Sequence, residues 1–157
     1  MKKEALENLF RKYYNEAKLY VVTLCHDLSL AEDIVSDSFY KAFTKIDEEK
    51  ESFKFWLFKV CRNAYFDHLK KTKRLSELDD NLGRDDDLAA RVIKNEEYQS
   101  LYRAISLLKP NYREIILLYY FDELSVSEIA GITDQTVENV KVQMYRARMK
   151  LKDILED

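Results

Sequence analysis

Apolar residues recur at steps of three and four along the first part of the chain, a spacing typical of helices that bury one face. We predict a first helix at 5–25. A second is predicted at 29–46, because Ser29 and Glu32 have the S-x-x-E spacing of a capping box, in which each side chain binds a backbone N–H. A third apolar stripe, at 53–71, follows a charged loop.

The end of the chain, 124–155, has the pattern of a helix-turn-helix. Ser125 and Glu128 form another capping box, the pattern is interrupted at 133–135, and Thr136 is placed to cap a longer helix. Its apolar face would comprise Val137, Val140, Met144, Ala147, Leu151 and Ile154. Its other face would carry Lys141, Tyr145, Arg146, Arg148, Lys150 and Lys152. Such a helix suits the DNA major groove, although an ordinary amphipathic hairpin has the same pattern.

Two further helices are predicted between these regions. One, at 96–108, would turn Tyr98, Leu101, Ile105 and Leu108 inward. Pro110 has the fixed φ that suits the first turn of the next.

Composition restricts the fold to helices. The 157 residues include two glycines and one proline, which leaves few β-turns, and 46% are apolar, enough for a core. Residues 76–95 are acidic and poor in apolar side chains. We therefore predict an all-α fold of two small helical domains, 1–75 and 96–157, joined by an acidic linker at 76–95, with the helix-turn-helix in the second.

The net charge of −3 conceals a segregated pattern. Residues 1–75 hold 15 basic and 12 acidic side chains (+3), 76–100 hold 3 and 8 (−5), and 101–157 hold 8 and 9 (−1). Basic residues cluster at 70–74 and 141–152. Because patches govern electrostatic binding more than the total does, this balance does not exclude a nucleic-acid partner.

The third helix is expected to have two contrasting faces. Ser52 can cap its start, and its buried stripe would comprise Phe53, Trp56, Leu57, Val60, Cys61 and Ala64. The other face mixes aromatic, cationic and polar groups: Phe55, Lys59, Arg62, Asn63, Phe66, Asp67 and Lys70. Aromatic rings stack on unpaired bases while cations hold phosphates, so this face suits single-stranded DNA, although aromatic residues at helical spacing are also common in cores.

The outer face of the second helix is polar, with Glu32, Asp33, Ser36, Asp37, Tyr40 and Lys41. Acids in a first turn stabilise any helix through its dipole. They could equally form a docking surface for a basic partner helix.

Four stretches in this order resemble one family: AEDIVSDSFYKAF (31–43), SFKFWLFKVCRNAYFDHLKK (52–71), LKPNYREIILLYYFDELSVSEIA (108–130) and TVENVKVQMYRARMKL (136–151). The chain is similar to the extracytoplasmic-function (ECF) sigma factors of bacterial RNA polymerase. With the first helix, the stretches cover nearly the whole chain outside the linker. Motif order is far harder to obtain by chance than any single motif.

The resemblance implies a subunit that binds core RNA polymerase and directs promoter-specific initiation. Docking on the clamp helices of the largest polymerase subunit would use Asp33, Ser36, Asp37 and Tyr40. The minus-10 element, with a flipped base, would contact Lys59, Arg62, Asn63, Asp67, Lys70 and Lys71. The minus-35 element would contact Thr136, Glu138, Asn139, Lys141, Val142, Tyr145, Arg146 and Arg148. An anti-sigma factor is a further implied partner.

Some residues depart from the family pattern. Asp134 stands where members commonly have glycine in the turn, and Glu138, Asn139 and Val142 replace commoner residues. These departures bear on which promoter is chosen more than on the fold.

No enzyme motif is present: the sequence has no P-loop, no G-x-S-x-G and no H-E-x-x-H. Cys25 and Cys61 lack a partner at ligand spacing, so both are expected to be structural, and no metal, cofactor or small-molecule substrate is predicted. The charged N-terminus and the lack of a long apolar run predict a cytoplasmic protein, which an anti-sigma factor could hold at the membrane.

The main alternative is a stand-alone helix-turn-helix transcriptional regulator, which would bind palindromic sites as a symmetric dimer. That function leaves the mixed face of the third helix and the acidic linker unexplained.

Overall fold

The computed structural model describes residues 2–45, 52–73 and 87–156. Within these ranges every regular element is a helix, which confirms the all-α prediction. None of the described helices is both long and apolar enough to span a bilayer. The chain divides into two compact units, Met1–Asp85 and Asp86–Asp157.

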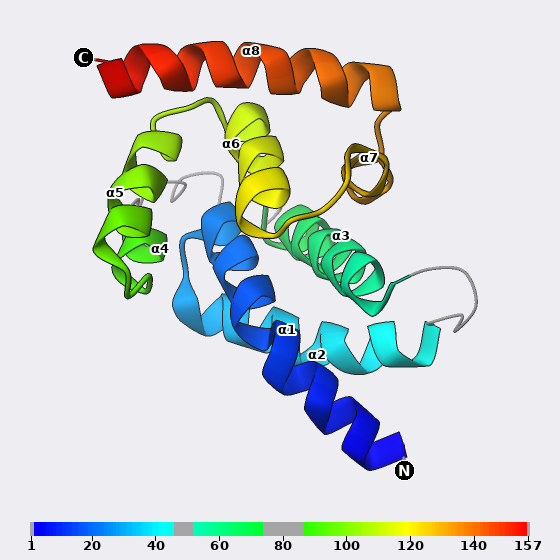
Figure 1. Cartoon of the computed structure of the whole chain (residues 1–157). Helices are drawn as coiled ribbons and strands as arrows, with labels where there is room; N and C mark the ends of the chain where they lie inside the picture. The colour runs from blue at the N-terminus through cyan, green and yellow to red at the C-terminus, as the bar shows by residue number, and fades with distance from the viewer. Residues whose placement is uncertain (1, 46–51, 74–86, 157) are drawn as a thin grey trace. The chain divides into compact units, whose positions relative to one another are not determined.

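The first unit is a bundle of three helices, α1 (Lys2–Cys25), α2 (Leu28–Lys45) and α3 (Phe53–Lys73), each of which packs against the other two (Figure 1). Their apolar stripes meet in one core, as the helical spacing predicts. The side chains without exposed surface come from all three helices: Ala17, Tyr20, Val21, Val22, Ala31, Val35, Ala42, Leu57, Phe58 and Cys61.

The turn between α1 and α2 corrects the predicted start of the second helix. His26 has a φ of 55°, in the left-handed region, and its N–H donates to Val22 O at 2.8 Å. The chain reverses there, so Asp27 becomes the cap and its Oδ1 accepts from Leu30 N at 3.1 Å. Ser29 lies inside the first turn, and the predicted capping box at this position was wrong.

The start of α3 agrees with the prediction, because Phe55 N donates to Ser52 Oγ at 3.1 Å. Phe58, however, is fully buried and stacks on Tyr20 with ring centroids 5.2 Å apart, whereas Trp56, assigned to the buried stripe, is only half-buried. The predicted charged loop, 47–51, lies outside the described residues.

The second unit contains α4 (Leu88–Arg91), α5 (Glu96–Ile105), α6 (Pro110–Ile116), α7 (Val126–Thr133) and α8 (Val137–Glu156). The long α8 lies across α5 and α6 and also packs against α7 (Figure 1). The α6 helix continues into a π-helical turn, Leu117–Phe121, where Asp122 N donates to Leu117 O at 3.2 Å. The fully buried side chains include Ile116, Leu117, Leu118, Ile129, Val140 and Ala147.

Two predictions for this unit had different outcomes. Pro110 occupies the first turn of α6, as predicted. Tyr98 does not face inward: its side chain is 58% exposed, and Tyr102, 2% exposed, is the buried tyrosine of α5. Tyr98 lies in the first turn of α5, where its N–H donates to Asn95 Oδ1 at 3.3 Å. Its ring lies beside that of Phe121, with centroids 6.1 Å apart.

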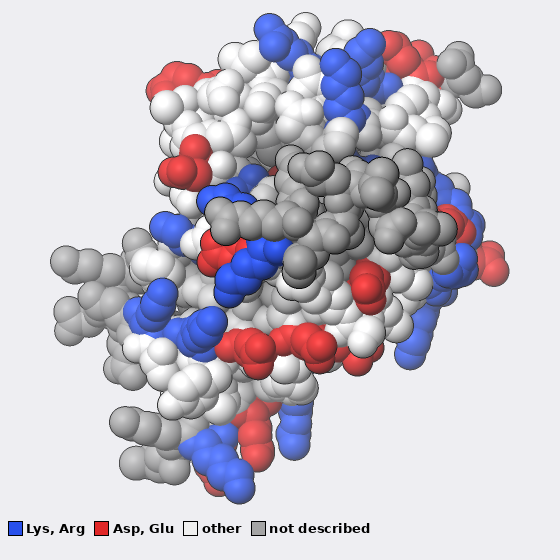
Figure 2. Space-filling view, turned by 180° about the vertical axis from the view of Figure 1, so that it is seen from behind, with Lys and Arg blue, Asp and Glu red and all other residues white. Residues whose placement is uncertain are grey.

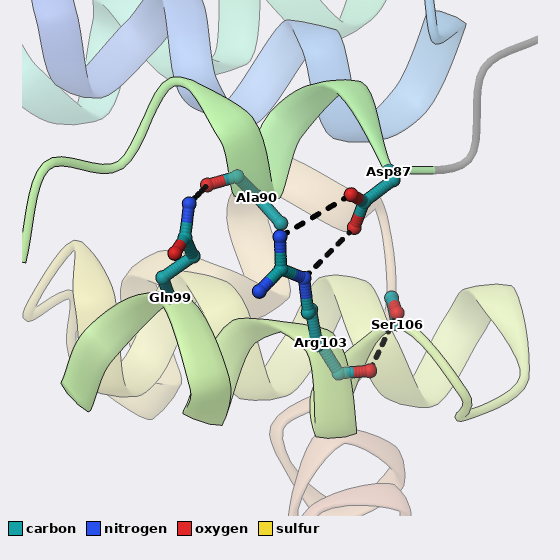
Figure 3. A network of polar contacts seen from close by, with 5 residues as sticks. All are labelled: Asp87, Ala90, Gln99, Arg103 and Ser106. Atoms are coloured by element: carbon teal, nitrogen blue, oxygen red, sulfur yellow. Dashed lines mark hydrogen bonds and ion pairs between the residues drawn. The ribbon is translucent and has the colours of Figure 1, made fainter. Parts of the chain in front are cut away.

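The short helix α4 lies within residues that the sequence assigned to the linker. Arg103 of α5 donates to both carboxylate oxygens of Asp87, at 3.1 and 3.3 Å, and Gln99 Nε2 donates to Ala90 O at 3.0 Å (Figure 3). Hydrogen bonding to the Asp87 carboxylate raises the pKa of Arg103. Ala89 and Ala90 are buried, so the second unit begins earlier than residue 96; the rest of the predicted linker, 76–86, lies outside the described residues.

Candidate nucleic-acid interface

The helix-turn-helix has the local geometry that its sequence predicts. The capping box of α7 is complete, with Ser125 N donating to Glu128 Oε1 and Glu128 N to Ser125 Oγ, both at 3.1 Å. Asp134 adopts a left-handed conformation, φ 56° and ψ 49°, which aspartate tolerates better than most residues. Thr136 caps α8 by accepting from Asn139 N at 3.1 Å.

A chain of side-chain hydrogen bonds crosses the turn. Thr133 Oγ1 donates to Ile129 O at 2.8 Å and accepts from Gln135 Nε2 at 2.9 Å. Gln135 Oε1 then accepts from Asn139 Nδ2 at 2.8 Å. The last turn of α7 and the first turn of α8 are thereby tied together.

The N-terminal half of α8 presents a continuous exposed face. Tyr145 is 66% exposed and Val142 45% exposed, and Glu138, Asn139 and Arg146 are exposed beside them. Val140, Met144 and Ala147 are buried on the opposite side, as predicted. An open hollow lies at the start of this face, lined by Asp134, Gln135, Thr136, Glu138, Asn139 and Val142. We name these side chains of α8, with the hollow, the α8 face.

Arg148 does not belong to the α8 face. Its Nε donates to Tyr120 Oη at 2.8 Å, and its guanidinium carbon lies 5.5 and 5.6 Å from the ring centroids of Tyr119 and Tyr120. Both tyrosines belong to the π-helical turn. Among the eight residues predicted to contact a minus-35 element, Arg148 is therefore the one whose side chain is held by the π-helical turn.

On α3, Phe55, Lys59, Arg62 and Phe66 lie on one face at i, i+4, i+7 and i+11, opposite the buried face. Lys59 Nζ lies 5.6 and 5.3 Å from the ring centroids of Phe55 and Trp56, and the Arg62 guanidinium lies 4.6 Å from that of Phe66. Along this face, which we name the α3 face, two aromatic rings flank two cations. Asn63, Asp67, Lys70 and Lys71 are exposed around it.

All four predicted docking residues of α2, which we name the α2 face, are solvent-exposed: Asp33, Ser36, Asp37 and Tyr40. Tyr40 is 66% exposed, a large aromatic side chain surrounded by polar groups. Figure 2 shows acidic side chains in a row at the height that α2 occupies in Figure 1, with basic side chains beside one end of the row. An exposed aromatic ring among carboxylates is suited to a basic protein partner.

Cys61 is a buried core residue, and Cys25 is half-buried at the end of α1. Burial raises the pKa of Cys25 to about 11 and that of Cys61 to about 12, so both thiols are protonated at neutral pH. Within the described ranges no cluster of three or more His, Cys, Asp or Glu side chains is arranged to hold a metal ion.

Comparison with known proteins gives two family matches and several full-length relatives. The family described as Sigma-70 region 2 matches residues 9–75, and that described as Sigma-70, region 4 matches residues 98–151. The chain is 30% identical over 153 residues to the ECF RNA polymerase sigma factor SigM of Bacillus subtilis, covering 94% of this chain and 93% of SigM. The chain belongs to the ECF sigma factors.

Other relatives and solved structures agree. The ECF RNA polymerase sigma factor SigW of Bacillus subtilis is 30% identical over 142 residues, covering 81% of this chain and 76% of SigW. The sigma factor RpoE of Bartonella quintana has the same fold, with a TM-score of 0.75, 23% identity and 98% coverage of both chains. CnrH gives a TM-score of 0.64 at 23% identity, covering 98% of this chain and 89% of CnrH.

As an ECF sigma factor, the protein binds core RNA polymerase and directs transcription initiation at promoters with minus-10 and minus-35 elements. The family assignment made from the sequence is confirmed. The stand-alone regulator is not favoured, because the relatives match both units and not the helix-turn-helix alone.

Sequence reasoning missed two features of the sigma factor's interfaces. One is the hydrogen bond between Gln135 and Asn139, because the apolar pattern marks Gln135 only as an interruption. The spacing of four residues between them was the signal that could have predicted it. The other is the contact between Arg148 and the tyrosines, which depends on a π-helical turn that apolar spacing does not reveal.

Proposed function

We propose that this ECF sigma factor selects promoters through two separate DNA-binding surfaces and binds the polymerase through a third. The α8 face would bind the minus-35 element, the α3 face the minus-10 element, and the α2 face the polymerase. The observation that carries the proposal is that the α2 and α8 faces are exposed, the α3 face is half-buried, and each is chemically matched to its target. The chain also aligns with the ECF sigma factor SigM over 93% of that relative.

Minus-35 recognition would use seven of the eight predicted residues: Thr136, Glu138, Asn139, Lys141, Val142, Tyr145 and Arg146. Support comes from their exposure along the start of a helix that docks by its opposite side, which is how a recognition helix enters the major groove. Arg148 is left out because its side chain is held by Tyr120.

Minus-10 recognition would use Lys59, Arg62, Asn63, Asp67, Lys70 and Lys71, together with the rings of the α3 face. Base–aromatic stacking contributes about 1–3 kcal/mol per base in single-stranded DNA binding. The cations beside Phe55 and Phe66 would bind phosphates next to stacked bases. A flipped base costs a few kcal/mol to unstack, which these contacts would offset.

The α2 face would dock on the clamp helices of the largest polymerase subunit through Asp33, Ser36, Asp37 and Tyr40. An anti-sigma factor would compete for this chain: RpoE is known in complex with the anti-sigma factor NepR, and CnrH with the cytosolic domain of CnrY. We place the protein in the cytoplasm, where the polymerase works and an anti-sigma factor could hold it at the membrane. The polymerase would supply all of the catalysis.

Promoter variants test the two DNA surfaces separately. Arg146→Ala should weaken initiation at the intact promoter, yet cause no further loss when the minus-35 element is already scrambled. Lys59→Ala with Arg62→Ala should behave in the same way toward the minus-10 element alone. Equal losses for both variants on both scrambled promoters would overturn the assignment of the surfaces, and core polymerase that initiates equally well without the chain would overturn the function.

A further inference from the structure

The hydrogen bonds that cross the helix-turn-helix have a fixed direction. Thr133 Oγ1 gives its one hydrogen to Ile129 O at 2.8 Å, so toward Gln135 it can only accept. Gln135 must therefore turn its Nε2 to Thr133, at 2.9 Å, and its Oε1 away. Asn139 must then present Nδ2 to that oxygen, at 2.8 Å, because its own Oδ1 would meet a second acceptor.

The result is an amide of Asn139 that cannot turn over without losing a hydrogen bond. One Nδ2 hydrogen is used by Gln135, which leaves the second hydrogen and Oδ1 of Asn139 for a ligand. Asn139 is exposed on the α8 face and lines its hollow. The Asn139 amide thus presents its donor, Nδ2, and its acceptor, Oδ1, to DNA in one fixed orientation.

The hollow is suited to a base edge and not to a phosphate. Two carboxylates, of Asp134 and Glu138, line it and would repel phosphate. Adenine presents an acceptor, N7, and a donor, the N6 amino group, in the major groove, which an asparagine amide can bind with two hydrogen bonds; guanine presents two acceptors, N7 and O6. Held in this order, the amide keeps Oδ1 opposite guanine O6, whereas an amide that rotates freely can turn Nδ2 toward O6 and therefore discriminates less against guanine.

We propose that Gln135 is a positioning residue, which holds the Asn139 amide so that it reads adenine in the minus-35 element. The inference rests on the proposed function of the α8 face and adds a determinant of its base preference. Gln135 itself need not touch DNA. Its effect is confined to the base pair that Asn139 contacts.

The test uses holoenzyme assembled from core polymerase and the full chain, with a promoter pool randomised across the minus-35 element, and measures the enrichment of each base at each position. Asn139→Ala identifies the position that Asn139 reads. There the wild type should prefer adenine over guanine by about 5- to 100-fold, as a bidentate pair provides. Gln135→Ala should lower this ratio by about threefold or more and leave the preferences at the other positions unchanged, because the freed amide can turn Nδ2 toward guanine O6.

Two further variants separate positioning from a merely structural role. Gln135→Glu keeps an oxygen that accepts from Asn139 Nδ2, so it should retain the adenine preference even if overall binding falls. Gln99→Ala removes another half-buried glutamine with one hydrogen bond in the same unit, to Ala90 O, and should leave every preference unchanged.

Each other outcome contradicts the inference in a distinct way. A uniform loss over all promoters for Gln135→Ala would assign it a purely structural role. A preference lost in Asn139→Ala but kept in Gln135→Ala would refute positioning while leaving base reading intact. If Asn139→Ala changes no preference although the holoenzyme still selects promoters, the inference fails and the proposed function stands. If the wild type selects no promoter at all, the proposed function itself fails.

Discussion

Arg146 and Arg148 lie two residues apart on α8, and the structure predicts opposite consequences of removing them. The Arg148 side chain is held by a 2.8 Å hydrogen bond to Tyr120 Oη and by the rings of Tyr119 and Tyr120. Arg146 is exposed on the α8 face. Arg148→Ala should therefore destabilise the second unit, whereas Arg146→Ala should weaken promoter binding.

The expected size follows from the contacts. An intramolecular hydrogen bond contributes about 0.5–1.5 kcal/mol, and an exposed cation–π contact about 0.5–1 kcal/mol. Because Arg148 is exposed, we expect about 1–2 kcal/mol in total for Arg148→Ala. Tyr120→Phe removes only the hydroxyl and should cost about 0.5–1 kcal/mol, with little further loss when Arg148 is already alanine.

Hydrogen exchange at the amides of α8 measures this locally, which avoids a two-state assumption for a chain of two units. Arg148→Ala should accelerate exchange about 5- to 30-fold, and Arg146→Ala less than about twofold.

Holoenzyme binding to promoter fragments is the second assay. Arg146→Ala should weaken it by about 1–3 kcal/mol if Arg146 reads a base. If Arg148→Ala left exchange unchanged and weakened promoter binding tenfold, Arg148 would be a DNA contact after all.

Three further predictions concern other parts of the chain. Asp33→Lys with Asp37→Lys should abolish binding to core polymerase without unfolding the chain, because both carboxylates are exposed; affinity and circular dichroism measure these effects. Arg103→Ala should accelerate hydrogen exchange in α4, whose first turn it holds. At pH 8 the thiols of Cys25 and Cys61 should react slowly with an aromatic disulfide until urea is added, since pKa values of about 11 and 12 leave about one thiolate in a thousand or fewer.

Each of these has a control or a contrary outcome. Glu4→Lys with Glu7→Lys places the same charge change on an exposed part of α1, and an equal loss of polymerase binding would show that total charge, not the α2 face, matters. Unchanged exchange in Arg103→Ala would mean that Gln99 and the buried alanines hold α4 alone. Rapid labelling of the folded chain would contradict the raised pKa values of the two thiols.

The sequence predicted features that depend on residues a few positions apart. The Ser125–Glu128 box and the Thr136 cap both follow from local hydrogen bonding, and each has the expected geometry. The start of α2 shows the limit of such signals. Asp27 and Ser29 are both good caps, and the left-handed His26 decides between them.

Features that depend on distant contacts were not predictable in this way. Four residues of α4 are too few to form a stable helix alone, and the helix is held by Arg103 and Gln99 from α5. Both Arg146 and Arg148 were predicted to contact DNA. Their charge and spacing do not reveal that Arg148 bonds to a tyrosine 28 residues away. The exposure of the α2 and α8 faces agrees with the sequence pattern, and the α3 face is half-buried. The contacts of all three faces with polymerase and promoter stay predictions.

In vitro transcription tests whether the chain selects promoters for core RNA polymerase. The chain is added to bare core RNA polymerase with a pool of random promoter fragments, and the starts of the transcripts are sequenced. We expect initiation from fragments that share one minus-35 and one minus-10 element at a constant spacing, with the minus-35 preference lost in Arg146→Ala. Transcripts that start without a shared element, or only from palindromic sites, would contradict this expectation.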